Sequence, residues 1–145
     1  MNRPKSLCRN SVVQCERTGC GIASVAAVAG VSYAAAKTAA DELGISAADA
    51  RLWSDTQPVR RLLTRFGYRS AMPRPFRSWQ RLPPMALLAI KWHVKDGRPY
   101  WHWVVFVRTS DCTCVLDSKK SLKVHVRTDF GRMKPKWYLA VSAKR

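Results

Sequence analysis

Four residues of this chain could together carry out nucleophilic acyl chemistry. Cys20, His102 and Asp117 follow one another in that order, and Gln14 lies six residues before the cysteine. A cysteine attacks as its thiolate, a histidine acts as the base and then as the acid, and a carboxylate orients the imidazole. A glutamine amide can donate a hydrogen bond to the oxyanion that forms. Each residue type is common alone, but the ordered set predicts a thiol hydrolase site.

The cysteine should stand at the beginning of a helix. The stretch from Cys20 to Ala29 consists mainly of small residues and is followed by Gly30, a typical helix end. The free N–H groups and the dipole at a helix N-terminus stabilise negative charge, which favours a thiolate there. Gly21 would allow a substrate carbonyl to approach the backbone closely.

The histidine and the aspartate should lie on adjacent strands. One predicted strand begins directly after His102, and another ends directly before Asp117. In an antiparallel hairpin opposed residues have a constant index sum, and for this pair the midpoint falls between Thr109 and Ser110, in a polar turn. We therefore expect the two side chains to face each other at about 4.5–5.5 Å between Cβ atoms. The alternative is an ordinary strand histidine and an ordinary turn aspartate.

The remaining pattern predicts an α+β fold in which N-terminal helices pack against a C-terminal antiparallel sheet. Two further helices are expected, one capped by Ser32 and running to Leu43, the other from Asp55 or Thr56 to Phe66. The segment 68–82 is rich in Arg and Pro and is expected to be irregular. Strands are expected at 85–92, 101–107, 112–117, 122–126 and 137–141.

The length of 145 residues fits one domain spanning 1–145, with 1–11 as a flexible basic arm. No apolar stretch approaches the ~20 residues that cross a bilayer, so no membrane span is expected. The basic N-terminus lacks the apolar core of a signal peptide. We therefore expect a cytoplasmic location, or export by a route that needs no signal peptide.

Five cysteines form neither a disulfide framework nor a zinc motif. Cys8, Cys15 and Cys20 are irregularly spaced, and Cys112 and Cys114 form an isolated Cys-x-Cys. We expect reduced thiols, no metal and no cofactor. The proximity of Cys15 to Cys20 leaves open a regulatory disulfide or coincidence.

The charge is strongly positive: 26 Lys and Arg oppose 9 Asp and Glu, for a net charge of +17. Eight arginines lie between Arg51 and Arg81. Such a surface attracts polyanions, so an acidic peptide or protein substrate and non-specific nucleic acid are both compatible partners. The six tryptophans could stack on bases or pack in a core. Oligomeric state is not predicted.

The segment from Gln14 to Gly21 resembles the Gln-x5-Cys-Gly motif of papain-like cysteine peptidases. Its continuation 22–28 is similar to the bacteriocin-processing branch, the double-glycine leader peptidases fused to ABC exporters. His102-Trp103-Val104-Val105 resembles the His-aromatic-Val-Val strand of that branch, and Asp117 follows fifteen residues after the histidine. Leu82-Pro83-Pro84 resembles the lead-in to the preceding strand.

The resemblance implies a papain-like fold and a cysteine peptidase that works through a thioacyl-enzyme. Because no transporter follows the peptidase-like part, we expect a stand-alone enzyme or a relative with another task. It implies Cys20 as nucleophile, His102 as general acid and base, Asp117 as orienting residue and Gln14 as oxyanion donor. The chain departs from the family at Gly19, Trp101 and Ser118, where Asp or Asn, a small residue and Pro are usual. A deamidase, amidase or acyltransferase with the same triad, or a basic nucleic-acid-binding module, are the alternatives.

Overall fold

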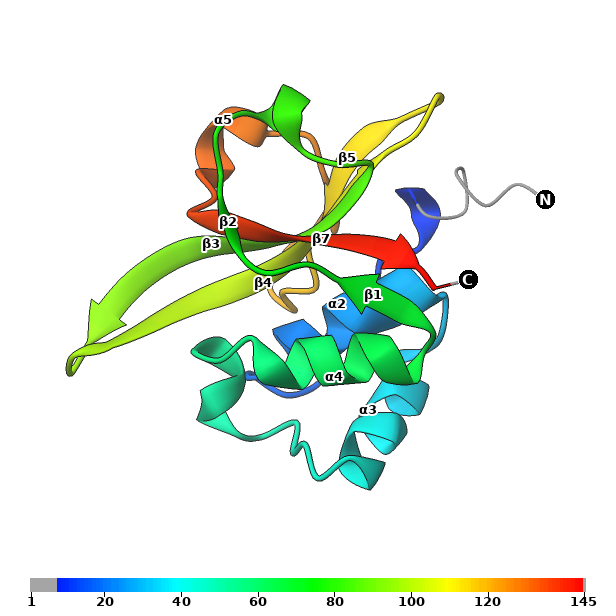
Figure 1. Ribbon diagram of the computed structural model, residues 1–145, viewed down its shortest axis with the longest axis vertical. Coiled ribbons are helices and arrows are strands. Elements are labelled where there is room, and N and C mark those ends of the chain that lie inside the picture. The colour runs from blue at the N-terminus through cyan, green and yellow to red at the C-terminus, as the bar shows by residue number, and fades with distance from the viewer. Residues whose placement is uncertain (1–7, 145) are drawn as a thin grey trace.

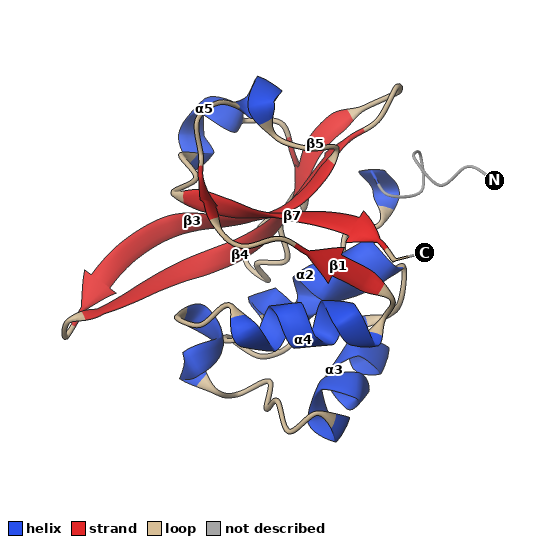
Figure 2. Cartoon of the chain, in the orientation of Figure 1, coloured by secondary structure: helices blue, strands red, loops and turns tan. Residues whose placement is uncertain are grey.

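The computed structural model describes residues 8–144; residues 1–7 and 145 lie outside the description. Three helices come first: α2 (Cys20–Ala29), α3 (Tyr33–Glu42) and α4 (Gln57–Arg65). The strands that follow form one antiparallel sheet (Figures 1 and 2). They are β1 (Tyr68–Ser70), β2 (Arg74–Pro75), β3 (Met85–Lys95), β4 (Arg98–Arg108), β5 (Thr113–Leu116), β6 (Val126–Arg127) and β7 (Trp137–Ala143). The predicted α+β class is confirmed.

The helix ends are those that the sequence indicates. Gly30 closes α2 in the left-handed conformation at φ 71°, and its N–H donates to Ala26. The Ser32 hydroxyl caps α3 by accepting from the N–H of Ala35 at 3.0 Å. Pro58 occupies the first turn of α4, where its missing N–H costs nothing. These local signals therefore fix the elements that bring the cysteine to its place.

The sheet has the strand order β1-β7-β3-β4-β5-β6, and β2 pairs with β7. The β3–β4 hairpin is longer than expected and turns at Asp96 and Gly97, whose φ values of 53° and 75° match the hairpin turn that Asp-Gly favours. Two predictions were too coarse. Segment 68–82 is not irregular throughout, because β1 and β2 both pair with β7. Of the strand expected at 122–126, only Val126 is in a strand, as the first of the two residues of β6.

The predicted hairpin register is wrong by two residues. Val105 pairs with Leu116 and Arg108 with Thr113, so the index sum is 221 rather than 219. Asp117 therefore lies diagonally from His102 instead of opposite it. The turn moves because the Thr109 N–H donates to the Cys112 carbonyl at 2.8 Å and closes the loop there. Since side chains alternate with a period of two, a shift by two keeps both residues on the same face.

The helices cover one face of the sheet, as Figure 1 shows. Alternate residues such as Leu87, Trp103 and Val105 point to that face and join the core made with α2, α3 and α4. The intervening residues, such as Val104 and Phe106, belong to a second cluster. That cluster is closed by aromatic and aliphatic residues of the chain before β3 and by the short helix α5 (Phe130–Met133). Both faces of the central strands are therefore buried.

The N-terminal segment is anchored from Cys8 onward. Cys8 forms a disulfide with Cys112, and the Asn10 side-chain amide donates to the Ala27 carbonyl at 2.6 Å. The described part of the expected flexible arm is thus held in place, while 1–7 lie outside the described residues. The expectation of reduced thiols is wrong for this pair, because the β4–β5 turn brings together two cysteines 104 residues apart. Disulfides are typical of oxidising compartments. The cytoplasmic location stays a prediction.

Within residues 8–144, no single helix is both long and apolar enough to cross a bilayer. Helices α2 and α3 reach the required length and composition only when taken together, and they are bent by 111° relative to each other.

Candidate active site

Cys20 is the first residue of α2 and is fully buried. Its Sγ accepts a hydrogen bond from the backbone N–H of Trp103 at 3.5 Å. The last β4 residue paired with β5 is Val105, opposite Leu116. Trp103 lies beyond this pair, and the N-terminus of α2 contacts β4 there. As the first helical residue, Cys20 also has a backbone N–H without an intrahelical acceptor.

Helix α2 can approach the sheet this closely because Gly21 lacks a side chain. A Cβ at this position would lie 2.7 Å from Cγ1 of Val59 on α4 and 3.2 Å from the Trp103 indole. The space that we expected to be open to a substrate carbonyl is therefore filled by protein. Gly21 serves the packing of α2 between α4 and β4, and this packing sets the position of the cysteine.

The histidine and the aspartate are in direct contact. His102 on β4 and Asp117, just beyond β5, are joined through Nε2 and Oδ1 at 2.7 Å. The same carboxylate accepts from the backbone N–H of Lys119 at 3.1 Å and from Nη1 of Arg127 at 2.9 Å. Burial alone would raise the pKa of Asp117, but the hydrogen bonds from His102, Lys119 and Arg127 outweigh it and lower the pKa to about 2. The side chain is a buried, charged acceptor.

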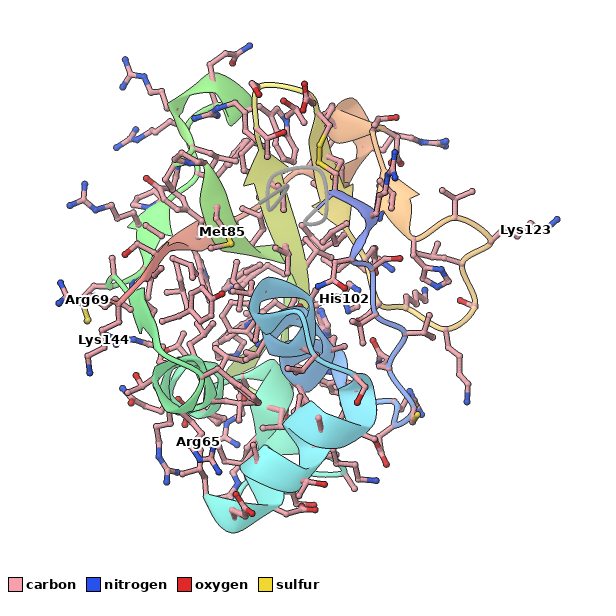
Figure 3. The ribbon with its side chains drawn as sticks, turned by 90° about the vertical axis from the view of Figure 1, so that its right-hand side faces the viewer. Arg65, Arg69, Met85, His102, Lys123 and Lys144 are labelled. Carbon is pink, nitrogen blue, oxygen red and sulfur yellow. A yellow bond between two sulfur atoms is a disulfide. The ribbon has the colours of Figure 1, made fainter. Side chains whose placement is uncertain are left out.

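His102 is shaped by both neighbours. Burial alone would lower its pKa, but the hydrogen bond with Asp117 and the nearby Cys20 sulfur outweigh it and raise the pKa to about 9. The imidazole is therefore protonated at neutral pH. Asp117 occupies Nε2, which leaves Nδ1 for the cysteine. Figure 3 shows His102 beside α2.

Gln14 lies at the same site but is engaged by other groups. Its amide nitrogen donates to the carbonyls of Glu16 at 3.0 Å and Arg17 at 2.9 Å, and its Oε1 accepts from the Ser118 hydroxyl at 2.7 Å. The Gln14 N–H also donates to the Ser118 carbonyl at 3.1 Å. Both amide hydrogens are thus used within the 14–17 loop, and the oxyanion role stays a prediction. Ser118, a departure from the family pattern, ties this loop to the aspartate.

The loop before the cysteine is held by a small polar network. Glu16 accepts from the Tyr33 hydroxyl and from the Lys37 ammonium, both on α3. A Cβ on Gly19 would lie 2.2 Å from the Tyr33 oxygen. The glycine that replaces the usual Asp or Asn therefore makes room for this tyrosine.

A cavity of about 810 Å³ lies over the site and is lined by Gln14, Trp101 and His102. Trp101, a departure from the family pattern, is buried and packs edge-on against Trp137 at 4.7 Å between ring centroids. Cysteine 15 is exposed, carries a free thiol and lines the cavity. The remaining lining is dominated by cations: Arg17, Lys91, Lys95, Lys119 and Lys120.

Sequence reasoning missed three contributors to the site: Arg127, Ser118 and Tyr33. None of the three belongs to a sequence motif, and each acts by contacting another residue that the fold brings close: Arg127 contacts Asp117, Ser118 contacts Gln14 and Tyr33 contacts Glu16. Arg127 reaches Asp117 because β6 pairs with β5 at Val115, which lies on the same face as Asp117. A sequence gives no register for a two-residue strand, so this contact had no recognisable pattern.

Near the disulfide, the sulfurs of Cys8, Cys112 and Cys114 lie within 4.8 Å of one another. Three thiolates can bind a soft metal ion, but the disulfide consumes two of them. No metal-dependent role follows for this cluster in the disulfide form.

No protein-family profile matches the chain, and no curated protein matches its sequence. Solved structures do match its fold. A double glycine motif protease from an AMS/PCAT transporter, in complex with the leader peptide, superposes with a TM-score of 0.60 at 17% identity, covering 92% of this chain and 91% of that one. The peptidase domain of Streptococcus ComA, a bi-functional ABC transporter involved in a quorum sensing pathway, gives 0.56 at 13% identity, covering 94% and 98%. The chain thus has the papain-like fold of bacteriocin-processing peptidases, as predicted.

Proposed function

We propose that this chain is a cysteine peptidase that cleaves a peptide bond through a Cys20–His102–Asp117 triad. The observation that carries the proposal is the placement of the three residues. The Asp117 carboxylate binds Nε2 of His102, and the Cys20 sulfur at the start of α2 accepts from the backbone N–H of Trp103, the residue after that histidine. Nucleophile, acid and orienting residue stand in the order that acyl transfer requires.

In the proposed reaction the resting site is an ion pair. A protonated His102 stabilises a thiolate on Cys20, assisted by the α2 N-terminus. The sulfur attacks the scissile carbonyl carbon, and the electron pair of the C=O bond moves to oxygen. His102 then gives its Nδ1 proton to the leaving amine as the C–N bond breaks. Water, deprotonated by the same nitrogen, attacks the thioester, the C–S bond breaks, the carboxylic acid leaves, and the Cys20 thiolate is restored beside protonated His102.

Two groups would hold the oxyanion. The backbone N–H of Cys20 is free of intrahelical bonding, and Gln14 is the second donor. Because its amide hydrogens now point to the Glu16 and Arg17 carbonyls, one of them must turn to the substrate oxygen. The sulfur is fully buried, so substrate entry must also displace side chains that cover it.

The proposed substrate is a peptide segment lying in the cavity beside His102. One structural neighbour holds a leader peptide, and a cavity of about 810 Å³ has room for several side chains. A double-glycine leader peptide is therefore the first substrate to test.

The test combines labelling with cleavage. A limiting amount of a peptidyl thiol electrophile should modify Cys20 before Cys15, with mass spectrometry identifying the residue. Peptide cleavage should disappear in Cys20→Ala and His102→Ala but persist in Cys15→Ala. Equal labelling of both cysteines, together with unchanged activity of His102→Ala, would rule the proposal out.

A further inference from the structure

Lys91 has an unusual backbone conformation next to the site. Its φ is 54°, in the left-handed region that residues other than glycine rarely adopt. The β3–β4 register shifts between Ile90 and His93, so Lys91 lies in a β-bulge. Ile90, directly before it, pairs with His102. Bulges and strained residues occur preferentially next to active sites, where they redirect a side chain. Here the redirected residue lines the cavity beside His102.

A second lysine approaches the same place from the other side. The backbone N–H of Lys119 binds Asp117, and its side chain also lines the cavity. Lys91 and Lys119 thus line one cavity. Burial and the neighbouring charge of Lys119 lower the pKa of Lys91. Two like charges held together in this way destabilise the empty site and favour an anion between them.

The protein does not neutralise this pair. Within residues 8–144, neither Lys91 nor Lys119 makes an ion pair. Asp117, whose charge acts on Lys91, is already bound by His102, Arg127 and a backbone N–H. Glu16, which also lines the cavity, is held by Lys37. The two ammonium groups keep hydrogen-bonding capacity that a bound ligand could use.

We propose that Lys91 and Lys119 form a carboxylate-binding subsite beside His102, which selects substrates with an acidic group near the scissile bond. The group is the side chain of an Asp or Glu, or the C-terminal carboxylate of the peptide. The role of the subsite in substrate selection rests on the proposed peptidase function. Carboxylate binding itself needs no catalysis.

The experiment therefore uses the full chain with Cys20→Ala, which cannot cleave. Three peptides with an uncharged N-terminal dye are titrated at physiological salt and followed by fluorescence anisotropy: hexaglutamate amide, hexaglutamine amide and hexaglutamine with a free C-terminus. Hexaglutamate should bind, and Lys91→Met with Lys119→Met should weaken it roughly tenfold, as expected for lost charge-assisted hydrogen bonds. If free-acid hexaglutamine binds as well as hexaglutamate, the terminal carboxylate is the ligand; if only hexaglutamate binds, the side chain is.

The control removes the same charge elsewhere. Lys123 and Lys144 are exposed and do not line this cavity (Figure 3). Their double Met variant should weaken hexaglutamate binding by no more than about twofold, the effect of net charge alone. Equal losses in the two double variants would overturn the subsite. Absence of cleavage by the unmodified chain, with the binding difference intact, would instead overturn the peptidase proposal only.

Discussion

The two sides of the candidate site are built on different principles. On the helix side, α2 is positioned at Gly21 by its fit against Val59 and Trp103. The sheet side, with His102, is positioned by the charges of Asp117 and Arg127. On the helix side, the free energy of unfolding should respond to a single added methyl group and should not depend on pH. On the sheet side, activity and stability should respond to the loss of a charge and should depend on pH. One site thus combines shape and electrostatics in separable parts.

The largest effect should come from the sheet side. In Asp117→Asn the amide can no longer hold the positive imidazole, so kcat/KM for peptide cleavage should fall by roughly 10³–10⁴. Without the carboxylate the pKa of His102 should fall below about 9, which moves the alkaline limb of the pH–rate profile to lower pH. The measurement is kcat/KM from pH 5 to 10. An unchanged alkaline limb would show that Asp117 is not the partner that matters.

A graded test of the same side uses Arg127. It contacts Asp117 and no substrate-lining group, so Arg127→Met should lower kcat by roughly tenfold and leave KM nearly unchanged. The control is Asp129→Asn, since Asp129 is the other partner of Arg127, at 2.7 Å. That variant should lose less activity because the contact with Asp117 remains. A larger loss in Asp129→Asn than in Arg127→Met would contradict this order.

The helix side is tested by Gly21→Ala. The added Cβ would meet Val59 and Trp103 at sub-contact distance, so the free energy of unfolding should fall by about 1–3 kcal/mol. The loss should be equal at pH 6 and pH 8. Gly131→Ala is the control, because a Cβ there meets nothing within 4 Å. Urea unfolding at the two pH values measures both. If the loss of unfolding free energy in Gly21→Ala changes with pH, the helix side and the sheet side are not independent.

Stability of the unaltered chain should itself depend on pH through the sheet side. Because the folded pKa of His102 is raised to about 9, its contribution is complete below about pH 6.5 and is lost as pH rises through 9. The pKa of Asp117 is lowered to about 2, so its contribution is complete above about pH 4 and is lost as pH falls through 2. Both shifts describe one ion pair and are not added; the loss at either end is on the order of 2 kcal/mol. His102→Gln should flatten the alkaline decline.

The smallest effect concerns Trp101 and Trp103, the two tryptophans of β4 on either side of His102. The Trp103 indole donates to the Leu52 carbonyl at 3.2 Å, whereas the buried Nε1 of Trp101 has no partner among the described residues. Trp103→Phe should therefore cost about 1–2 kcal/mol more than Trp101→Phe, which relieves an unsatisfied donor. Thermal unfolding of both variants measures this difference. Equal costs would mean that packing, not the hydrogen bond, dominates at this position.

The sequence predicted those parts of the molecule that local chemistry controls. Gly30 and Ser32 mark helix ends through φ and capping, and these ends lie where we expected them. The cysteine at a helix start and the shared face of His102 and Asp117 also follow from local periodicity. Residue order alone was enough for these features.

What the sequence missed depends on contacts between distant segments. The hairpin register was wrong by two because the Thr109–Cys112 bond, not the centre of the polar stretch, sets the turn. The Cys8–Cys112 disulfide joins residues 104 apart, which spacing cannot reveal. The capture of both Gln14 donors depends on a loop conformation that has no sequence pattern.

That disulfide also decides how the molecule would carry mechanical load. A pull between the segment before Cys8 and the C-terminal strand β7 would pass through the Cys8–Cys112 bond and then along residues 113–144. Residues 9–111, which include Cys20 and His102, would lie outside the loaded path. Reduction would return them to it. Tethering at the N-terminus would therefore load the aspartate side of the site before the cysteine side.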